Sequence, residues 1–354
     1  MLQEAAFKSE AEPDLVGWLV KRAHRRYGLH SGDQDPDVTA AWTALRNAGY
    51  AHDGPVHDPT AVASFPPKGV PAWMGFSGNT PKPALCLDWR AWGSLLAAAP
   101  KVQTPMPETF SYDLVDVGRE VMSQLTIPVA ANFSEALSLG PNHLYATTHT
   151  VSNDDGADSV RAVPDEARLN ATGQLYVRVL RDLDTLLATD QAFLLGSWLQ
   201  RARRLGGNAT DCTDTVLGSK LFKCSDFMEW NARAQLTTWH PVTSPTHPRP
   251  NPEGSGGTWP GHIDDYARKQ WAGLVGDYYA VRIDSCYLKI GMAAATKGEP
   301  VDTASVTKCQ AALGYSWQTD WGDAKYPSQP VGDPVAVSTA LRTKYAPYFA
   351  SCGN

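Results

Sequence analysis

The chain has 354 residues, of which 43% are hydrophobic and 19% are charged, and its formal net charge is -6. This composition is typical of a globular protein with a substantial core. The acidic balance argues against a nucleic-acid-binding protein, because no basic field is present to neutralise phosphates. No apolar run approaches the roughly 20 residues that a bilayer span needs, so we expect no membrane segment.

Apolar residues at three- and four-residue steps predict helices along most of the chain. In chain order, the predicted helices cover about 14–27, 35–45, 89–98, 111–128, 175–188, 190–206, 262–281 and 335–345. Between them, Pro/Gly-rich or polar stretches predict loop-rich insertions near 52–83, 129–172 and 240–261. No block reads as a set of strands. The sequence therefore predicts an all-α fold, an irregular multi-helix domain with long loops.

Three of these helices carry specific expectations. An apolar stripe marks the helix at 175–188, formed by Tyr176, Val179, Leu180, Leu183, Leu186 and Leu187. Pro128 is expected to end the helix that begins near Ser111, since proline lacks the amide that a helix interior uses. In the helix at 262–281, we expect ion pairs Asp264–Arg268 and Asp265–Lys269 on a solvated face.

The six cysteines predict neither a zinc site nor a unique disulfide pattern. They contain no CxxC pair, so the usual zinc-ligand spacing is absent and we expect no metal. Cys212 and Cys224 bracket a short polar loop and are the best candidates for a local disulfide. Six cysteines still allow fifteen pairings, and the sequence leaves these open.

Glycosylation sequons point to a secretory history. They stand at Asn132, Asn170 and Asn208, and together with an even number of cysteines they favour passage through the secretory pathway. The first ten residues lack the basic start and apolar stretch of a signal peptide. We therefore expect Met1 to be internal to a longer precursor. The alternative is a cytosolic protein with free thiols and unused sequons.

The sequence offers no self-contained catalytic motif. A glycosidase needs two carboxyl groups in defined roles, and a chain with 37 acidic residues always offers a pair. Helical position assigns structural roles to Asp113, Asp116 and the acids at 264–265. His240 and His247, on a Pro-rich loop, make no metal motif, and phosphate or dinucleotide fingerprints are absent, so we expect no cofactor.

Aromatic and aliphatic side chains gather at both ends of the loop at 240–261. Trp239 precedes it, and Ile263 and Tyr266 follow it. Such a group can stack on the apolar face of a sugar and surround an acetyl methyl, while a phenol hydroxyl fixes the orientation. Periodicity alone favours packing in the core over this binding role.

Five segments in order resemble the C-terminal helical domain of the alpha-N-acetylglucosaminidases, glycoside hydrolase family 89. They are Tyr112–Val117, Phe193–Leu199, Gln235–Trp239, Asp265–Leu274 and Tyr326–Pro330. The resemblance implies a domain that packs on a (β/α)8 barrel, whose carboxylates perform retaining hydrolysis of terminal α-linked N-acetylglucosamine, as at the ends of heparan sulfate. It also implies that Trp239, Ile263 and Tyr266 contribute to the sugar pocket.

The resemblance also sets expectations for the domain limits. Residues 1–11 resemble the last part of the barrel, and residues 12–354 the helical domain. The family's nucleophile segment, Pro-Glu-Gly, is expected upstream of Met1, so the chain alone should bind sugar without cleaving it. His240 replaces the usual glycine after the pocket tryptophan, and the following loop is longer than in the family.

Two rival hypotheses remain at this stage. The first is a non-catalytic carbohydrate-binding or scaffold protein derived from this family, and the second is an independent enzyme that uses acids of this chain. The expected partner is an N-acetylglucosamine-terminated glycan, in an extracellular, lysosomal or vacuolar setting. A barrel-facing apolar surface would favour self-association into a homo-oligomer if it were exposed.

Overall fold

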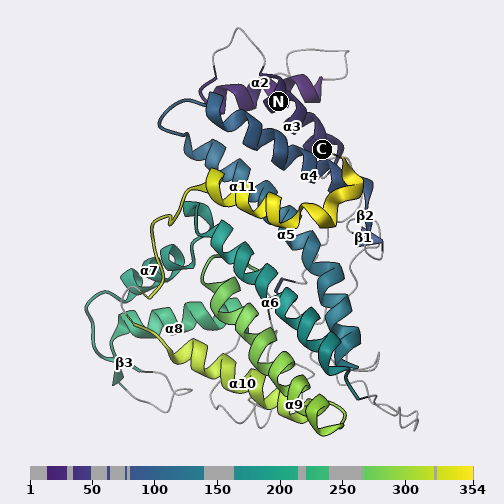
Figure 1. The fold of residues 1–354 in the computed structure, drawn as a ribbon. Coiled ribbons are helices and arrows are strands. Elements are labelled where there is room, and N and C mark those ends of the chain that lie inside the picture. Colours follow the sequence, from purple (N-terminus) through teal and green to yellow (C-terminus); the bar gives the residue numbers. More distant parts are fainter. Residues whose placement is uncertain are drawn as a thin grey trace. The chain divides into compact units, whose positions relative to one another are not determined.

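In a computed structural model, the protein is all-α (Figure 1). The structure describes residues 14–29, 35–48, 62–63, 76–77, 80–138, 163–213, 221–238, 265, 267–322 and 325–353. The chain divides into two compact units. Unit 1 comprises residues 1–58, 71–124 and 332–354, and unit 2 comprises residues 59–70 and 125–331. Unit 1 is therefore discontinuous in sequence.

The helices fall in the order that the sequence predicts, with additional ones in the second half. The α-helices are α2 (Leu15–Arg26), α3 (Pro36–Asn47), α4 (Pro83–Ala98), α5 (Glu108–Leu137), α6 (Glu166–Leu187), α7 (Leu195–Gly206), α8 (Cys224–Thr237), α9 (Lys289–Lys297), α10 (Thr303–Thr319) and α11 (Pro334–Tyr345). Shorter 3-10 segments are η2 (Ala99–Lys101), η4 (Gln191–Phe193) and η7 (Ala346–Cys352). The π-helical segments are η5 (Val275–Tyr279) and η6 (Arg282–Leu288). Two antiparallel pairs join β1 (Phe76–Ser77) to β2 (Thr80–Pro81) and β3 (Cys212–Thr213) to β4 (Leu221–Phe222).

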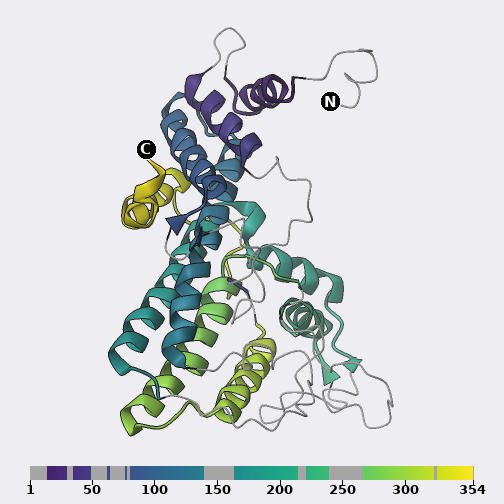
Figure 2. The ribbon, with the colours of Figure 1, turned by 90° about the vertical axis from the view of Figure 1, so that its right-hand side faces the viewer.

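In unit 1, α2, α3 and α4 pack in sequence against one another (Figure 2). Asp14 and Asp35 cap α2 and α3 by accepting backbone amide hydrogen bonds in the first turn. Helix α2 buries Val20, Ala23 and His24. The helix predicted at 89–98 begins earlier, at Pro83, where proline's missing amide removes nothing that the first turn needs.

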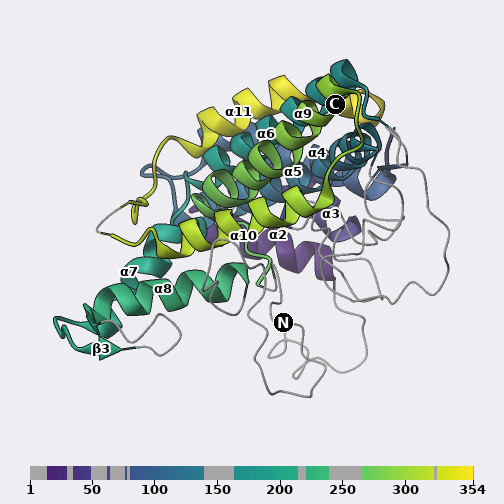
Figure 3. The same cartoon turned by 90° about the horizontal axis from the view of Figure 1, so that it is seen from below.

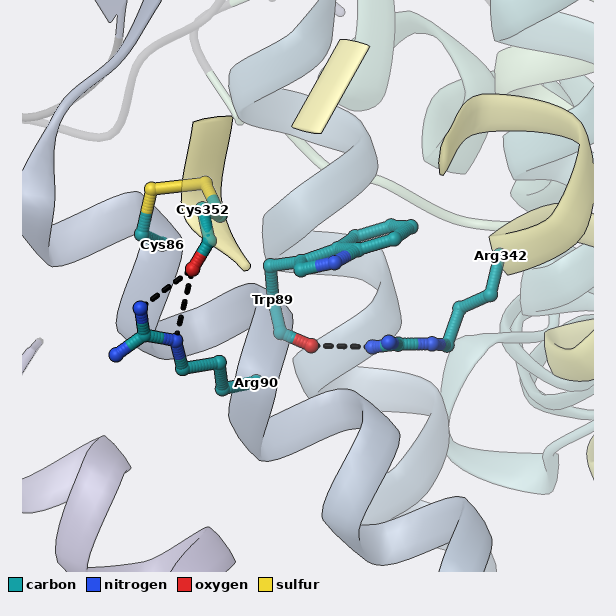
Figure 4. Close-up of a disulfide and its surroundings, with 5 residues drawn as sticks. All are labelled: Cys86, Trp89, Arg90, Arg342 and Cys352. Atoms are coloured by element: carbon teal, nitrogen blue, oxygen red, sulfur yellow. Dashed lines mark hydrogen bonds between the residues drawn. A yellow bond between two sulfur atoms is a disulfide. The ribbon is translucent and has the colours of Figure 1, made fainter. Parts of the chain in front are cut away.

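The C-terminal segment is fastened to α4 by a disulfide and three side chains (Figure 4). Cys86 bonds Cys352, and the Arg90 Nε donates to the Cys352 carbonyl at 3.0 Å. The Trp89 ring stacks on Phe349 with ring centroids 4.2 Å apart. On α11, the Arg342 guanidinium lies 4.1 Å from the Trp89 ring centroid and donates to the Trp89 carbonyl.

The helix α5 does not end at Pro128, contrary to the prediction. It continues to Leu137, with Pro128 inside it. The reason is packing: Val129, Ala130, Phe133, Ala136 and Leu137 are all buried, and their burial outweighs one missing hydrogen bond. The predicted insertion at 129–172 is wrong at both ends, since α6 already begins at Glu166. Its middle, 139–162, lies outside the described residues.

Helix α6 forms the centre of unit 2. All six residues of its predicted apolar stripe are fully buried. The helix packs on α9 and the two π-helical segments, and Figure 3 shows α6 and α9 side by side. It begins nine residues before the predicted start because Asp165 caps it and Leu169 and Gly173 already face the core. The polar residues of this first part occupy its outer side.

Three disulfides pair all six cysteines. The structure forms the local Cys212–Cys224 bond that the sequence favoured, beside the β3–β4 pair. Cys286 of η6 bonds Cys309 of α10. Helix α7 ends at Gly206 as predicted, and α7 and α8 pack closely together. The predicted helix at 335–345 is confirmed as α11. Helices α8, α9 and α10 have no counterpart among the predicted helices.

Candidate functional site

The predicted pocket residues Trp239, Ile263 and Tyr266 lie outside the described residues, as does the loop at 240–261. The structure does describe their neighbours in the chain. Thr237 and Thr238 close α8 immediately before Trp239, and Asp265 immediately precedes Tyr266. These three residues are buried. The geometry around them shows how the two ends of the loop are held.

A backbone hydrogen bond joins the two ends of this loop. The Asp265 amide donates to the Thr237 carbonyl at 2.6 Å. That carbonyl belongs to the last turn of α8, where helix carbonyls have no partner within the helix. Thr237 and Asp265, which are 28 positions apart in sequence, are therefore joined by one hydrogen bond, and the segments that carry Trp239 and Tyr266 start from this contact.

The helix predicted at 262–281 is wrong in its first half. Asp265 and Arg268 have positive φ values of 55° and 46°, which a right-handed helix does not accommodate. The helical conformation starts only near Leu274 and continues as π-helix. The predicted Asp265–Lys269 ion pair is also wrong, because Asp265 faces inward. Asp264 lies outside the described residues.

Asp265 forms a buried ion pair with Arg282 of η6. The Arg282 Nη1 lies 3.0 and 2.9 Å from the two carboxylate oxygens, and both residues are less than a tenth exposed. Burial acts most strongly and lowers the pKa of Arg282, but the charge of Asp265, the neighbouring tyrosines and the hydrogen bonds to Asp265 together outweigh burial, so the net pKa is raised. Removing one partner of such a pair leaves a buried charge and destabilises a protein by about 3–5 kcal/mol.

Other groups complete the surroundings of Arg282. Its Nη2 donates to the Ala63 carbonyl, so a residue far away in sequence closes this part of unit 2. The rings of Tyr278 and Tyr279 each lie with their centroid 5.3 Å from the guanidinium carbon. Burial first, and then the Asp265 charge, raise the pKa of the Tyr279 hydroxyl well above its ordinary value. The Tyr279 hydroxyl therefore stays neutral and Arg282 stays charged at any physiological pH.

A side-chain amide secures the end of α8. The Gln318 Nε2 of α10 donates to the hydroxyl oxygens of Thr237 and Thr238, at 2.8 and 2.7 Å. The Thr237 hydroxyl itself donates to the Arg233 carbonyl at 2.9 Å. Gln318 and Thr237 are fully buried. Both threonine hydroxyl groups therefore have hydrogen-bond partners, and these partners hold the two side chains in place.

A second polar group fastens α8 to α10 one turn earlier. Arg233 is fully buried, donates to the Glu229 carboxylate from Nε and Nη2, and donates to the Trp317 carbonyl at 3.1 Å. Arg203 of α7 donates to the other Glu229 oxygen at 2.8 Å. The Arg233 guanidinium also lies over the rings of Trp317 and Tyr326. This network fixes α7, α8 and α10 together.

The segments singled out by their resemblance meet in unit 2. Leu194 bridges Ala272, and the Ser197 hydroxyl donates to the Ser328 carbonyl at 3.3 Å. A side chain on Gly196 would lie 2.2 Å from the Pro327 carbonyl oxygen, so only glycine allows this approach of the two backbones. With the Thr237–Asp265 contact, four of the five segments form one connected region. Tyr112–Val117 lies in unit 1 and is outside it.

Two half-buried acids have raised pKa values, but neither makes a catalytic pair. Burial, and then the Glu120 charge, raise the pKa of Asp88 to about 7. Burial raises the pKa of Asp184 to about 6, although it accepts 2.7 Å hydrogen bonds from the amides of Gly273 and Gly276. Asp184 thus caps the start of the π-helical segment, which is a structural role. Asp88 belongs to unit 1.

Asp113 and Asp116 have the structural roles that the sequence indicated, with different partners. Asp113 is buried and accepts hydrogen bonds from Arg26 and from the Tyr27 hydroxyl, at 3.1 and 2.7 Å. Asp116 pairs with Arg119 at 2.8 Å. Within the described part of the chain, no group of three or more His, Cys, Asp and Glu residues is arranged to hold a metal. His240 and His247 lie outside that part.

The asparagines of the three sequons differ in their exposure to solvent. Asn208 is exposed in the turn after α7, and Asn170 is exposed on α6. Asn132 lies half-buried inside α5 rather than at the edge of an exposed excursion. Where the structure is described, no helix combines the length and apolar character needed to cross a bilayer.

Sequence reasoning missed the residues that hold the site, chiefly Gln318, Arg282 and Arg233. A buried arginine or glutamine has no periodic signature of its own. The sequence did carry one indication for Arg282. This residue lies on the apolar side of the segment that includes Tyr278 and Tyr279, where burial of an unpaired charge is costly. Such a position predicts an acidic partner, although not which one.

Comparisons with known proteins give a family, a human relative and a solved structure with the same fold. The family whose model matches is the alpha-N-acetylglucosaminidase C-terminal domain, over residues 18–344. Human alpha-N-acetylglucosaminidase is 28% identical over 354 residues, which are 99% of this chain and 38% of the human protein. A family 89 glycoside hydrolase from Clostridium perfringens, solved with 2-acetamido-1,2-dideoxynojirmycin, shares the fold with a TM-score of 0.63 and 18% identity. That likeness covers 94% of this chain and 32% of the bacterial one.

The chain thus spans well under half the length of these relatives. The match to the family covers most of its length. The chain belongs to the alpha-N-acetylglucosaminidase C-terminal domain family.

Proposed function

We propose that this chain is the sugar-contacting helical domain of an alpha-N-acetylglucosaminidase-like glycoside hydrolase. The reaction is retaining hydrolysis of terminal, non-reducing α-linked N-acetylglucosamine, as at the ends of heparan sulfate. The observation that carries the proposal is the hydrogen bond from the Asp265 amide to the Thr237 carbonyl. It brings the segments that carry Trp239 and Tyr266 to one place, in a chain that belongs to this family.

The chemistry of the three pocket residues suits this substrate. Trp239 offers an aromatic face for the apolar side of the pyranose ring, and Ile263 offers an apolar contact for the acetyl methyl. The Tyr266 hydroxyl adds a donor and acceptor that discriminates between sugar epimers. The iminosugar in the bacterial relative also bears an acetamido group. This supports a pocket that reads that group.

Hydrolysis itself requires a carboxylic acid to protonate the leaving oxygen and a second carboxylate as nucleophile. We assign both to a (β/α)8 barrel, on which residues 12–354 pack and to which residues 1–11 belong. The acids of this chain support that division. Asp265, Glu229, Asp184 and Asp113 all bind cations or backbone amides of their own unit. They are engaged in structure and do not face each other across a reacting bond.

The covalent features of the chain support a secretory setting. All six cysteines are paired, and such disulfides persist in oxidising compartments. Asn208 and Asn170 are exposed and accessible to glycosylation. We therefore place the protein in the extracellular space, a lysosome or a vacuole, as a glycoprotein that binds an N-acetylglucosamine-terminated glycan.

Ligand binding to the purified 354-residue chain tests the proposal. Saturation-transfer NMR with N-acetylglucosamine should show transfer to the acetyl methyl and to one ring face. Glucose, which lacks the acetamido group, should bind less. The Trp239→Ala variant should lose the signal without losing its helical circular dichroism. The matched control is Trp198→Ala, an exposed tryptophan on the same unit.

A hydrolysis assay addresses the division of chemistry. The chain should not release the aryl group from an aryl α-N-acetylglucosaminide. Measurable turnover that a single Asp or Glu substitution in this chain abolishes would refute the assignment of the carboxylates to a barrel. Absence of any sugar binding by a folded chain would refute the pocket.

A further inference from the structure

Two tryptophans meet on the surface of unit 2. The ring of Trp198, on α7, and the ring of Trp271 have their centroids 5.8 Å apart and their planes inclined by 48°. Trp271 is half-buried, and Trp198 is 38% exposed, although tryptophan side chains are on average highly buried. Part of this aromatic pair therefore remains open to a ligand.

The backbone segments that carry the two tryptophans are fixed to each other. The Leu195 amide donates to the Ala272 carbonyl at 3.2 Å, and the Ala272 amide donates to the Phe193 carbonyl at 2.8 Å. The next residue, Gly196, lies directly against the backbone of Pro327. Because both segments are held in this way, the rings keep their relative position before a ligand arrives. A preorganised surface of this kind loses little conformational entropy on binding.

Positive charge adjoins the aromatic pair. The Lys269 ammonium lies 5.5 Å from the Trp271 ring centroid, and Arg201 follows Trp198 by three residues, so that the two share one face of α7. Both cations are exposed, and among the described residues no carboxylate pairs with either of them. Neither α7 nor the segment 267–274 contains an acidic residue, although the net charge of the chain is -6. This surface is therefore locally cationic on an acidic protein, and it suits an anionic ligand.

The aromatic rings and the cations together indicate the class of ligand. A pyranose ring has an apolar face that stacks on an indole, and a carboxylate or sulfate on that ring can pair with Lys269 or Arg201. A protein partner is disfavoured, because the centre of a protein interface is depleted of charged residues, whereas here the cations adjoin the rings. A nucleic acid is disfavoured by the acidic balance of the whole chain.

We propose that Trp198, Trp271, Lys269 and Arg201 form a binding site for an anionic glycan, whose pyranose rings carry carboxylate or sulfate groups. Trp198 supplies the stacking surface, Trp271 supports it, and the two cations bind the negative charges. No bond is made or broken at this site. The inference is independent of the sugar pocket in the proposed function, because N-acetylglucosamine is neutral and offers the cations no charge.

Two substitutions in the 354-residue chain test the site. Trp198→Ala removes the exposed ring, and its matched control is Trp18→Ala, which removes a half-buried tryptophan with Arg22 over its ring in unit 1. Lys269→Gln removes one charge from an exposed side chain and leaves the core intact, and its control is Lys297→Gln at the end of α9. Circular dichroism establishes that each variant is folded. If Trp198→Ala does not fold, Lys269→Gln decides the question alone.

Fluorescence anisotropy with an end-labelled heparin hexasaccharide, which carries both carboxylates and sulfates, measures the affinity. Trp198→Ala should weaken binding about tenfold or more, as the loss of a central tryptophan does at many interfaces. Lys269→Gln should weaken it about two- to fivefold, and both controls should stay within about twofold of the parent. Maltohexaose, a neutral oligosaccharide of the same length with the same label, should bind about tenfold more weakly or less. Added salt should weaken only the binding of the anionic ligand.

The inference is overturned if the parent chain does not bind the heparin hexasaccharide, or if the folded site variants bind it as tightly as the parent. Equal affinity for maltohexaose would show that the site does not recognise charge. A single-stranded DNA hexanucleotide bound as tightly, with the same loss in Trp198→Ala, would show a general polyanion site instead of a glycan site. Self-association of the parent in light scattering that Trp198→Ala abolishes would assign the surface to a second copy of the chain.

The same variants separate this inference from the proposed function. Trp198→Ala should keep whatever binding of N-acetylglucosamine the parent chain shows, because that neutral sugar is not the ligand of this site. If the parent chain does not bind N-acetylglucosamine, the proposed function fails, and the hexasaccharide measurements still decide whether the anionic site exists.

Discussion

The disulfide between Cys86 and Cys352 makes a prediction whose size follows from the chain. It joins residues 266 positions apart, whereas the Cys212–Cys224 bond joins residues 12 apart. In the chain-entropy model, a disulfide stabilises by restricting the unfolded chain, more so for longer loops. That relation gives about 5–6 kcal/mol for the long loop and about 3 kcal/mol for the short one.

The perturbation is replacement of each pair by serine, in separate double variants. The local contacts of the C-terminal segment, Trp89 with Phe349 and Arg342 with Trp89, remain in the folded state of the first variant. The loss therefore arises chiefly in the unfolded chain. We expect the long-loop variant to lose about 3 kcal/mol more than the short-loop variant, because only the loop length differs in the relation.

Native-state hydrogen exchange with peptide-level mass spectrometry is the suitable assay, because the two disulfides belong to different units. Peptides from α4 report unit 1 and peptides from α8 report unit 2. Equal losses in the two variants, or a larger loss for the short loop, would refute the entropic reasoning and show that the long disulfide acts through local contacts.

Three further changes test the packing and the electrostatics. Gly196→Ala drives a methyl group into backbone carbonyls and should destabilise unit 2 by about 1–3 kcal/mol, while Gly322→Ala, with no atom nearby, should be neutral by urea denaturation. Glu229→Gln leaves the buried Arg233 without its carboxylate and should cost about 3–5 kcal/mol, whereas Asp226→Asn at a more exposed acid should cost about 0–1 kcal/mol; thermal unfolding compares the two. The folded pKa of Asp88, about 7, exceeds its unfolded value, so the stability of the wild type falls as the pH rises from about 4 to 7. Relative to the wild type, Asp88→Asn should gain up to about 4 kcal/mol over that range; a pH-independent difference contradicts the raised pKa.

The sequence predicts the helices of this protein well where a continuous apolar stripe is long enough to dominate. Helix α6 is the best example, because all six stripe residues are buried. Pro128 shows the limit of a local rule. Proline removes one hydrogen bond, yet five buried residues follow it in α5 and make continuation of the helix favourable. Local propensity yields to packing that involves distant parts of the chain.

The candidate site was predictable in its segments but not in its supports. Periodicity assigned Asp265 to a solvated helix face, because nothing local reveals that its backbone turns into a left-handed conformation there. Its true partner, Arg282, lies on a π-helical segment, whose spacing of side chains departs from the 3.6-residue period used for prediction. Gln318 is recognised only once α10 is placed beside the end of α8.

The discontinuity of unit 1 has a consequence for how ribosomes make this protein. Residues 332–354 are synthesised after all of unit 2, yet they supply Arg342, Phe349 and Cys352 to a unit that also needs residues 1–58 and 71–124. Unit 2 lies entirely before residue 332 and emerges complete beforehand. We therefore predict that a chain truncated after Val331 keeps the protease resistance of unit 2 but loses that of α4. Limited proteolysis of the truncated chain measures both. Equal resistance of both would contradict this order of folding.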